Sequence, residues 1–297
     1  MKPARIAAGI FLTVLLIAGL WWFGRNPSGD GQSTKLTAAP APALPKVPKI
    51  HVAVYLSQYC ASGADGTQWV YGHSCQMAGD LHDPALDVVP IIEPGTENID
   101  TMPKLLDHFF PGATPADATN PAILKSFDVI VVPRINYLRD DVRQGIEAAV
   151  RNGTGLLIRN TFGNGVPGYT PEMARLNGFD ECEFTYNPHP VECQVLAEHP
   201  ILGSLKKGDV IKITPNGPGG KLIAGSVPLI KVKNKDDIGG TDTDPEFYPL
   251  FLSQLDKGRI AQCIFPAWEP TPAVLQKATG GKFNVRVIKW LAKKPVD

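Results

Sequence analysis

The segment "LRDDVRQGIEAAVRNGTGLLIRN", residues 138–160, decides the fold because it joins a helix closely to a buried strand. Its first part carries one apolar face with helical spacing, formed by Leu138, Val142, Ile146, Ala149 and Val150. Gly153 is placed to end this helix. The run that follows, residues 155–159, is mostly apolar and does not alternate, which is typical of a strand covered on both faces. The segment therefore predicts one helix–strand unit of an α/β protein.

The same pattern extends towards the N-terminus. Apolar runs at residues 50–56, 86–94 and 127–134 predict three further strands. Residues 99–110 have helical spacing, with Asp100 placed as an N-cap. This order of strands and helices implies right-handed crossovers. We therefore expect an α/β domain with a mostly parallel central sheet and helices on both faces, as in flavodoxin-like proteins.

The second half of the chain is less regular. A short helix is expected at residues 170–178, and residues 193–205 run from a strand into a turn. Three short strands, at residues 208–213, 221–226 and 227–233, predict an antiparallel extension of the sheet. A strong strand at 257–268 and an amphipathic helix at 282–293 complete the domain.

Residues 6–23 form an uncharged apolar run of 18 residues, close to the length of about 20 that spans a bilayer. We expect residues 1–23 to be a signal anchor, with a cleaved signal peptide as the alternative. Lys2 and Arg5 favour a cytoplasmic N-terminus, which places the rest of the chain outside the cytoplasm, in the periplasm of a bacterium. Residues 24–49 are rich in Pro, Ala and Gly and predict an extended linker to a domain at 50–297.

The charge is balanced, with 29 basic and 29 acidic residues, so nothing indicates a nucleic-acid partner. The spacing of the cysteines is compatible with two local disulfides, Cys60–Cys75 and Cys182–Cys193. Candidate metal ligands cluster nearby in "GHSCQMAGDLHD", namely His73, Cys75, Asp80, His82 and Asp83. Their spacing matches no zinc signature, so we expect neither a metal nor another cofactor.

The order of several short motifs resembles a known superfamily. These motifs are "SFDVIVVP", "AAVRNGTGLLIRN", "EHPILGSL", "KGRIAQCIFP" and the closing "RVIKWLA". Together they resemble the class I glutamine-amidotransferase-like superfamily, and most of all its trehalose-utilization (ThuA-like) group, over residues 50–293. The resemblance implies an amidotransferase-like α/β fold.

The departures from this pattern bear on activity. The superfamily's enzymes place a cysteine on the turn after the central strand, activated by a histidine that a carboxylate holds. The matching turn here begins Asn160-Thr161, and the stretch "IFPAWEP" keeps Glu269 but has no histidine. Glutamine hydrolysis is therefore not expected. His199 is expected to bond a turn, and Cys263 to be a buried apolar residue.

A binding site does not need a catalytic triad of cysteine, histidine and carboxylate. It needs polar residues, and several follow the ends of the predicted strands. Ligands of open parallel sheets bind beyond the carboxyl ends of the strands. The candidate ligand-binding residues there are Gln58, Tyr59, Arg134, Asn136, Arg159, Asn160, Thr161, Asn164, Trp268 and Glu269. Their amides, charges and aromatic rings suit a carbohydrate. The alternative is that they pair with one another, notably Arg159 with Glu269.

Three functional classes stay open. The first is a membrane-anchored, non-catalytic amidotransferase-like domain that acts in ligand binding or protein assembly outside the cytoplasm, with a carbohydrate or protein partner. The second is a ThuA-like enzyme of carbohydrate metabolism, as the resemblance implies. The third is a metal- or thiol-dependent activity built on the cysteines and histidines between residues 60 and 82.

Overall fold

The computed structural model describes residues 48–56, 81–95, 102–133, 138–159, 170–186, 189–238, 246–266 and 271–297. By its internal contacts the chain divides into residues 1–46 and a compact unit of residues 47–297. All described residues belong to the second unit. Among them, no helix is long and apolar enough to cross a membrane. The expected anchor at residues 6–23 and nearly all of the linker lie outside the described residues.

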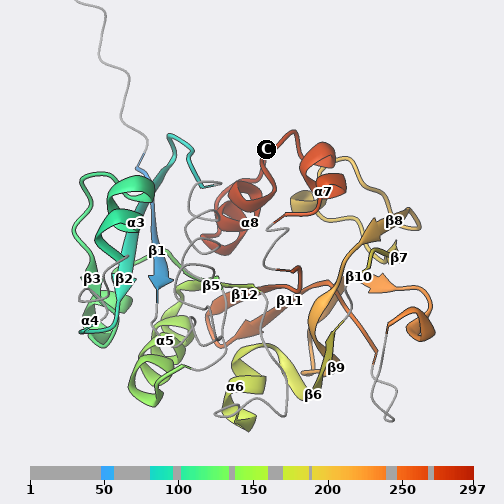
Figure 1. Ribbon diagram of the computed structural model, residues 1–297, viewed down its shortest axis with the longest axis horizontal. Coiled ribbons are helices and arrows are strands. Elements are labelled where there is room, and N and C mark those ends of the chain that lie inside the picture. The colour runs from blue at the N-terminus through green and yellow to red at the C-terminus, as the bar shows by residue number, and fades with distance from the viewer. Residues whose placement is uncertain are drawn as a thin grey trace, which may run out of the picture. The chain divides into compact units, whose positions relative to one another are not determined.

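A sheet of ten strands runs through this unit, and one half of it is parallel (Figure 1). The order of the parallel half is β3-β2-β1-β4-β5-β12. Its strands are β1 (Ile50–Leu56), β2 (Leu86–Ile92), β3 (Ala116–Asp117), β4 (Val129–Val132), β5 (Gly155–Arg159) and β12 (Gly258–Cys263). Every residue of β4 and β5 is buried, because both faces of these central strands are covered.

The other half of the sheet is antiparallel and continues from β12 in the order β11-β10-β7-β8. Its strands are β7 (Val191–Val195), β8 (Val210–Ile213), β10 (Val227–Val232) and β11 (Leu250–Leu255). A separate antiparallel ribbon pairs β6 (Phe179–Tyr186) with β9 (Asn216–Leu222). Five of the nine pairings in the ten-stranded sheet are parallel, so the sheet is mostly parallel with the antiparallel extension that the sequence predicts.

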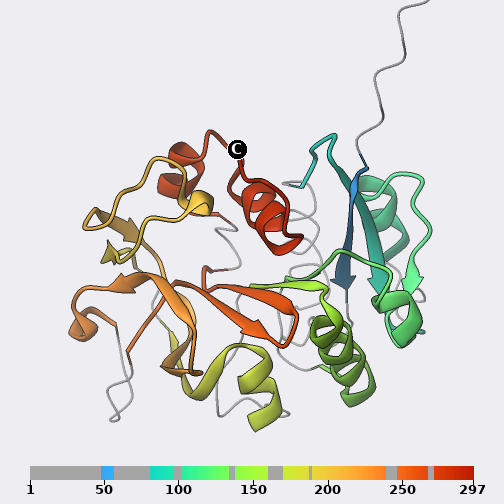
Figure 2. The same cartoon turned by 180° about the vertical axis from the view of Figure 1, so that it is seen from behind.

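Short helices cover the sheet. They are α3 (Met102–Phe109), α4 (Pro121–Leu124), α5 (Asp140–Asn152), α6 (Pro171–Leu176), α7 (Ala273–Ala278) and α8 (Phe283–Leu291), with 3-10 turns η3 (Pro200–Leu202) and η4 (Lys235–Asp237). Figures 1 and 2 show α8 on one side of β5, β12 and β11, and α5 and α6 on the other. The central strands therefore have helices on both faces, as expected.

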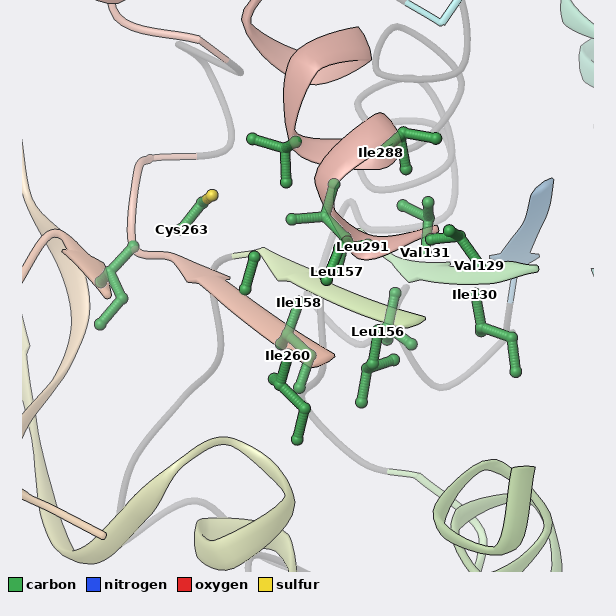
Figure 3. Packing of buried hydrophobic residues seen from close by; sticks show 14 of the residues in the cluster. Val129, Ile130, Val131, Leu156, Leu157, Ile158, Ile260, Cys263, Ile288 and Leu291 are labelled. Carbon is green, nitrogen blue, oxygen red and sulfur yellow. The ribbon is translucent and has the colours of Figure 1, made fainter. Parts of the chain in front are cut away.

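The unit formed by α5 and β5 follows the sequence prediction closely. The five apolar residues predicted for one face of α5 are all buried: Leu138, Val142, Ile146, Ala149 and Val150. Gly153 ends the helix with a φ of 123°, a value that favours glycine. Figure 3 shows Ile288 and Leu291 of α8 on one side of the central strands with Cys263, and Ile260 on the other.

Some elements differ from the prediction. The predicted strand at 221–226 lies instead at Asn216–Leu222, and a turn follows, closed by a bond from the Ser226 amide to the Ile223 carbonyl (3.2 Å). The glycine-rich run of β9 becomes a strand because it pairs along the whole of β6. β6 and β11 were not predicted as strands. The strand expected at 257–268 ends at Cys263, and Asp100 lies outside the described residues.

The start of β12 has room only for glycine. A Cβ at Gly258 would lie 2.2 Å from the Val150 carbonyl oxygen and 2.6 Å from that of Thr154. We predict that Gly258→Ala lowers the free energy of unfolding by about 1–3 kcal/mol, the usual cost of overpacking, in a urea titration.

The matched control is Gly145→Ala in α5. A Cβ there would meet only the tip of the Leu124 side chain, at 2.8 Å, and alanine favours a helix by about 1 kcal/mol over glycine. This variant should stay within about 1 kcal/mol of the wild type. Equal losses for the two variants would show that the β12 contact is not tight.

Candidate ligand site at the carboxyl edge of the parallel strands

The order of the parallel strands defines where a ligand would bind. Without the short edge strand β3, the order β2-β1-β4-β5-β12 is 2-1-3-4-5 in sequence, the flavodoxin-like order. From β1 the chain goes on to β2, towards one edge of the sheet, and from β4 it goes on to β5, towards the other edge. Sheets of this kind bind ligands at the carboxyl ends of the two strands at such a switch point. Here these ends are Leu56 and Val132.

A buried arginine lies at this edge. Arg159 is the last residue of β5 and only 3% exposed. Its Nη1 donates to Oδ1 of Asn284 (3.0 Å), and its guanidinium lies over the Phe265 ring at 5.5 Å from the centroid. Burial of a guanidinium is costly unless hydrogen bonds and charges compensate it. Arg159 is therefore held in place at the edge by groups from other elements.

The partner of Arg159 is itself fixed. Asn284 lies in the first turn of α8, is 2% exposed, and donates from Nδ2 to Oγ1 of Thr271 (3.0 Å). We call Arg159, Asn284 and Thr271 the arginine cluster. It ties the end of β5 to the start of α8 and to the segment before α7, so a guanidinium with five N–H donors is presented in a set orientation.

A second buried polar pair lies near the other side of the switch point. Tyr55, the penultimate residue of β1, donates a short hydrogen bond from its hydroxyl to Oε1 of Glu93. Glu93 directly follows β2, and both residues are only 1% exposed. The carboxyl group of Glu93 is thus held against the end of β1, the strand at the switch point.

The strand register places the two features on opposite faces of the sheet. In the strand pairing, Tyr55 of β1 lies opposite Ile91 of β2. The registers of β1 with β4 and of β4 with β5 put Tyr55 in the same row across the sheet as Ile158. Side chains of neighbouring strands at one level point to the same face, and consecutive residues point to opposite faces. Arg159 therefore points to the face of α8, and Tyr55 to the other. Only a group lying across the carboxyl edge can reach both.

The structure describes one of the ten predicted ligand-binding residues, Arg159, and places it at the predicted edge. The other nine lie outside the described residues: Gln58, Tyr59, Arg134, Asn136, Asn160, Thr161, Asn164, Trp268 and Glu269. Sequence reasoning missed Tyr55, Glu93, Asn284 and Thr271. Glu93 carried a signal, because it is an ionisable residue directly after an apolar strand. Asn284 and Thr271 carried none, because only the packing of α8 brings them to β5.

The cysteines do not support the predicted pairing. Cys182 lies in β6 and Cys193 in β7, which belong to different sheets, and Cys193 is a thiol that bonds the Val191 carbonyl (3.7 Å). The two are buried but not joined by a disulfide. Cys60 and Cys75 lie outside the described residues.

Two of the described thiols, Cys193 and Cys263, are poorly suited to nucleophilic chemistry. Burial raises the pKa of Cys193 and of Cys263 to about 12. The thiolate is the nucleophile, so both groups are inert at neutral pH. Cys263 is fully buried in β12 beside Arg159, in agreement with its interpretation as an apolar residue.

The described residues contain no group of three or more His, Cys, Asp or Glu side chains that could hold a metal. Two of the candidate ligands, His82 and Asp83, line a cavity of about 370 Å³ with Leu81, Phe110 and Pro111. This cavity includes Leu86, the first residue of β2, and so lies at the end of that strand away from the carboxyl edge. His73, Cys75 and Asp80 lie outside the described residues.

His199 is a turn residue bonded to the backbone, as expected. Its Nδ1 accepts a hydrogen bond from the Ile201 amide (3.3 Å) and caps η3. Its ring packs edge-on against Trp290 at 5.6 Å between centroids. Burial, and secondarily the charge of Arg259, lower the pKa of His199. The neutral imidazole is therefore the form that the fold selects.

Comparison with solved structures bears on the fold. The chain matches no protein-family model and no curated protein. A solved protein from Bacteroides uniformis, described as ThuA-like, has 15% identity and a TM-score of 0.50, covering 84% of this chain and 95% of that one. A cytoplasmic protein from Salmonella typhimurium has 13% identity and a TM-score of 0.46, covering 82% and 99%. The β-galactosidase from Rahnella sp. R3 has 13% identity and a TM-score of 0.42, covering 84% and 32%.

The described unit is thus an α/β domain with a flavodoxin-like strand order. More specifically, it has a ThuA-like fold, which the similarity to the Bacteroides protein supports.

Because the pKa of His199 is lowered in the folded chain, the unfolded chain binds more protons below pH about 6.5. We predict that stability is unaffected by His199 above that pH and falls as the pH drops below it. His199→Asn keeps a capping side chain but does not titrate. Urea titrations should show that the free energy of unfolding falls more between pH 7 and pH 5 for the wild type than for this variant. An equal fall in both proteins would contradict the selection of the neutral imidazole by the fold.

Proposed function

We propose that the chain is a membrane-anchored binding domain of ThuA-like fold that holds a small polar ligand at the carboxyl edge of its parallel strands. The observation that carries this proposal is the buried guanidinium of Arg159 at that edge, oriented by Asn284. The other residues of β5 are glycine and aliphatic residues, as packing alone requires. A fixed, buried arginine donates paired hydrogen bonds, which suits a carboxylate, phosphate or carbonyl group of a ligand.

In this proposal the chain shares the fold of class I amidotransferases but does not carry out their covalent chemistry. The turn that matches the position of the nucleophilic cysteine begins Asn160-Thr161 and has no cysteine, and residues 264–270 contain no histidine. Burial raises the pKa of Cys263, which lies opposite Arg159 on the neighbouring strand, to about 12. Glutamine hydrolysis through a thioester therefore has no support from the groups present. The binding part of such a site needs only oriented polar side chains.

The proposed location rests on the sequence. Residues 6–23 would anchor the chain, and residues 24–49 would hold the domain away from the bilayer, outside the cytoplasm. In this arrangement the domain would bind a ligand, or present it to a protein partner, at the outer surface of the membrane.

A second candidate is an enzyme of carbohydrate metabolism. It is favoured by the position of the Tyr55–Glu93 pair, a buried carboxyl group hydrogen-bonded near the switch point of the sheet. A metal- or thiol-dependent activity has no comparable support in the described part of the chain.

Native mass spectrometry of the full chain, before and after denaturation, should detect a polar ligand that co-purifies with the protein. If none co-purifies, the same measurement should detect binding of a member of a panel of sugars, sugar acids and organic acids. We predict that Arg159→Gln weakens binding of this ligand at least 10-fold, about 1.4 kcal/mol, in isothermal titration. The physical reason is the loss of a charged, bidentate donor.

The matched control is Arg259→Gln. Arg259 also lies in a strand, contacts a ring (Trp290, 4.9 Å) and donates to a carbonyl (Trp290, 2.7 Å), but it is near the amino end of β12. This variant should lose stability and keep its affinity. Glu269→Gln, alone and with Arg159→Gln, tests the alternative that the two residues only pair with each other. In that case both single variants would lower stability and leave binding unchanged, contrary to the proposal.

A further inference from the structure

The outward face of α8 is basic, although the charge of the whole chain is balanced. Residues 271–296 contain six Lys or Arg residues and no Asp or Glu. Lys282, Arg286 and Lys289 lie four and three residues apart and so share one face of the helix, whose Val, Ile, Leu and Phe residues are buried. Lys293 lies in the turn that ends the helix. We call these four cations the α8 basic face.

The contacts of these side chains leave most of their charge uncompensated. Arg286 donates to a backbone carbonyl at 2.9 and 2.7 Å, and Lys293 donates to another at 2.7 Å. A carbonyl group carries no net charge that could offset a cation. Within the described part of the chain, the only ion pair on this face joins Lys289 to Asp297 (2.6 Å).

Asp297 shows that the face attracts an anionic group. The hydrogen bond from Lys289, and then the charges of Lys289, Lys282 and Arg286, lower the pKa of this carboxyl group. Its side chain is nevertheless 81% exposed. An anion from outside can therefore reach the same cations and replace it.

Helix α5 shows how the fold compensates charge elsewhere. Arg143 pairs with Asp140 and Glu147, and Arg151 pairs with Glu147 and Asp256. The cations of the α8 basic face lack such a set of carboxylates among the described residues. A cluster of one sign of charge on one surface is typical of a site that attracts an anionic partner.

The α8 basic face lacks the apolar anchors of a protein interface. The exposed large hydrophobic residues that the structure describes are Val210 and Val227, which belong to β8 and β10. Protein interfaces depend on a few anchors in well-packed, desolvated pockets. Three of the four cations are lysines, which act as hydrated point charges. A face that offers charge alone suits an extended anionic surface such as phospholipid headgroups.

The C-terminal end of α8 lies at the edge of the sheet where β1 begins. The Asp128 amide donates to the His51 carbonyl (3.0 Å), and the Gly155 amide donates to the Asp128 carbonyl (2.8 Å). A Cβ at Gly155 would lie 2.7 Å from that of Leu291. Figures 1 and 2 both show the start of β1 and the C-terminus towards the top of the view. A tether that joins β1 would thus enter the domain at the edge where α8 ends.

From this charge and position we propose that the α8 basic face binds anionic phospholipid headgroups, so that the anchored domain lies against the bilayer. The inference rests on the anchoring by residues 6–23 that is part of the proposed function. Because a tether keeps the domain close to the bilayer, weak contacts suffice to hold it there. Asp297 competes with the headgroups for the same cations and so weakens this contact.

Lysine acetylation followed by mass spectrometry tests the inference on the full wild-type chain. The chain is reconstituted in nanodiscs of phosphatidylcholine, alone or mixed with phosphatidylglycerol. Labelling of Lys282 and Lys293 should fall in the anionic discs, and about 0.5 M salt should restore it. Lys221 and Lys233, which pair with carboxylates away from α8, should be labelled equally in both discs.

Two variants have opposite expected effects on this labelling. Lys289→Gln removes a cation and should lower the ratio of docked to free domain about 5-fold, whereas Asp297→Asn removes the competing carboxylate and should raise it about 5-fold. If the pair only stabilised the end of the chain, both variants would change the ratio in the same direction, contrary to the inference. The matched control is Lys233→Gln, which breaks an exposed pair with Glu192 (3.0 Å) and should leave the ratio unchanged.

The outcomes separate the inference from the proposed function. Equal labelling of the wild type in anionic and neutral discs overturns the inference and leaves the anchored binding domain standing. Stronger protection of the same lysines by polyglutamate in neutral discs than by anionic discs would assign the face to an acidic protein and also overturn it. Failure of the chain to co-elute with either kind of disc overturns the anchoring itself.

Discussion

The structure depends on β12, which must pair with two different partners. On one side it runs parallel to β5, and on the other antiparallel to β11. It therefore joins the parallel half of the sheet to the antiparallel half. The close approach of Gly258 to the carbonyl groups of Val150 and Thr154 fixes where this strand begins. That contact sets its register against β5, with Arg159 opposite Cys263.

This register has consequences for the edge where a ligand would bind. Since Arg159 points to the α8 face, α8 can supply a partner, and Asn284 in the first turn of that helix does so. On the opposite face, the pairing of β1 with β2 brings Glu93 to Tyr55. The two polar features are thus set by backbone pairing, and the strand order places the switch point between them.

Prediction from the sequence succeeds where a segment is locally consistent. The face of α5, its end at Gly153 and the buried strand at residues 155–159 follow from periodicity and glycine alone. The sequence fails where long-range pairing decides the structure. β9 is a strand only because it lies along β6, since glycine and proline, which make up most of its run, are depleted in strands.

The candidate site shows the same division. Arg159 could be predicted because it ends a recognisable central strand. Asn284 could not, since it lies 125 positions from Arg159 and meets it only through packing of α8 on the sheet. Thr271 could not either, because it joins the cluster through Asn284. The expected disulfide failed for a similar reason, because eleven residues of sequence separation say nothing about which sheet each cysteine joins.

The central claim is that a small polar ligand is held by Arg159 at the carboxyl edge of the parallel strands. A crystal structure of the chain with the ligand that mass spectrometry identifies tests it most directly. The account predicts ligand density at the carboxyl edge, with a carboxylate, phosphate or carbonyl group at the Arg159 guanidinium. Density in the cavity beside Leu81 and Phe110, with none at the carboxyl edge, would contradict it.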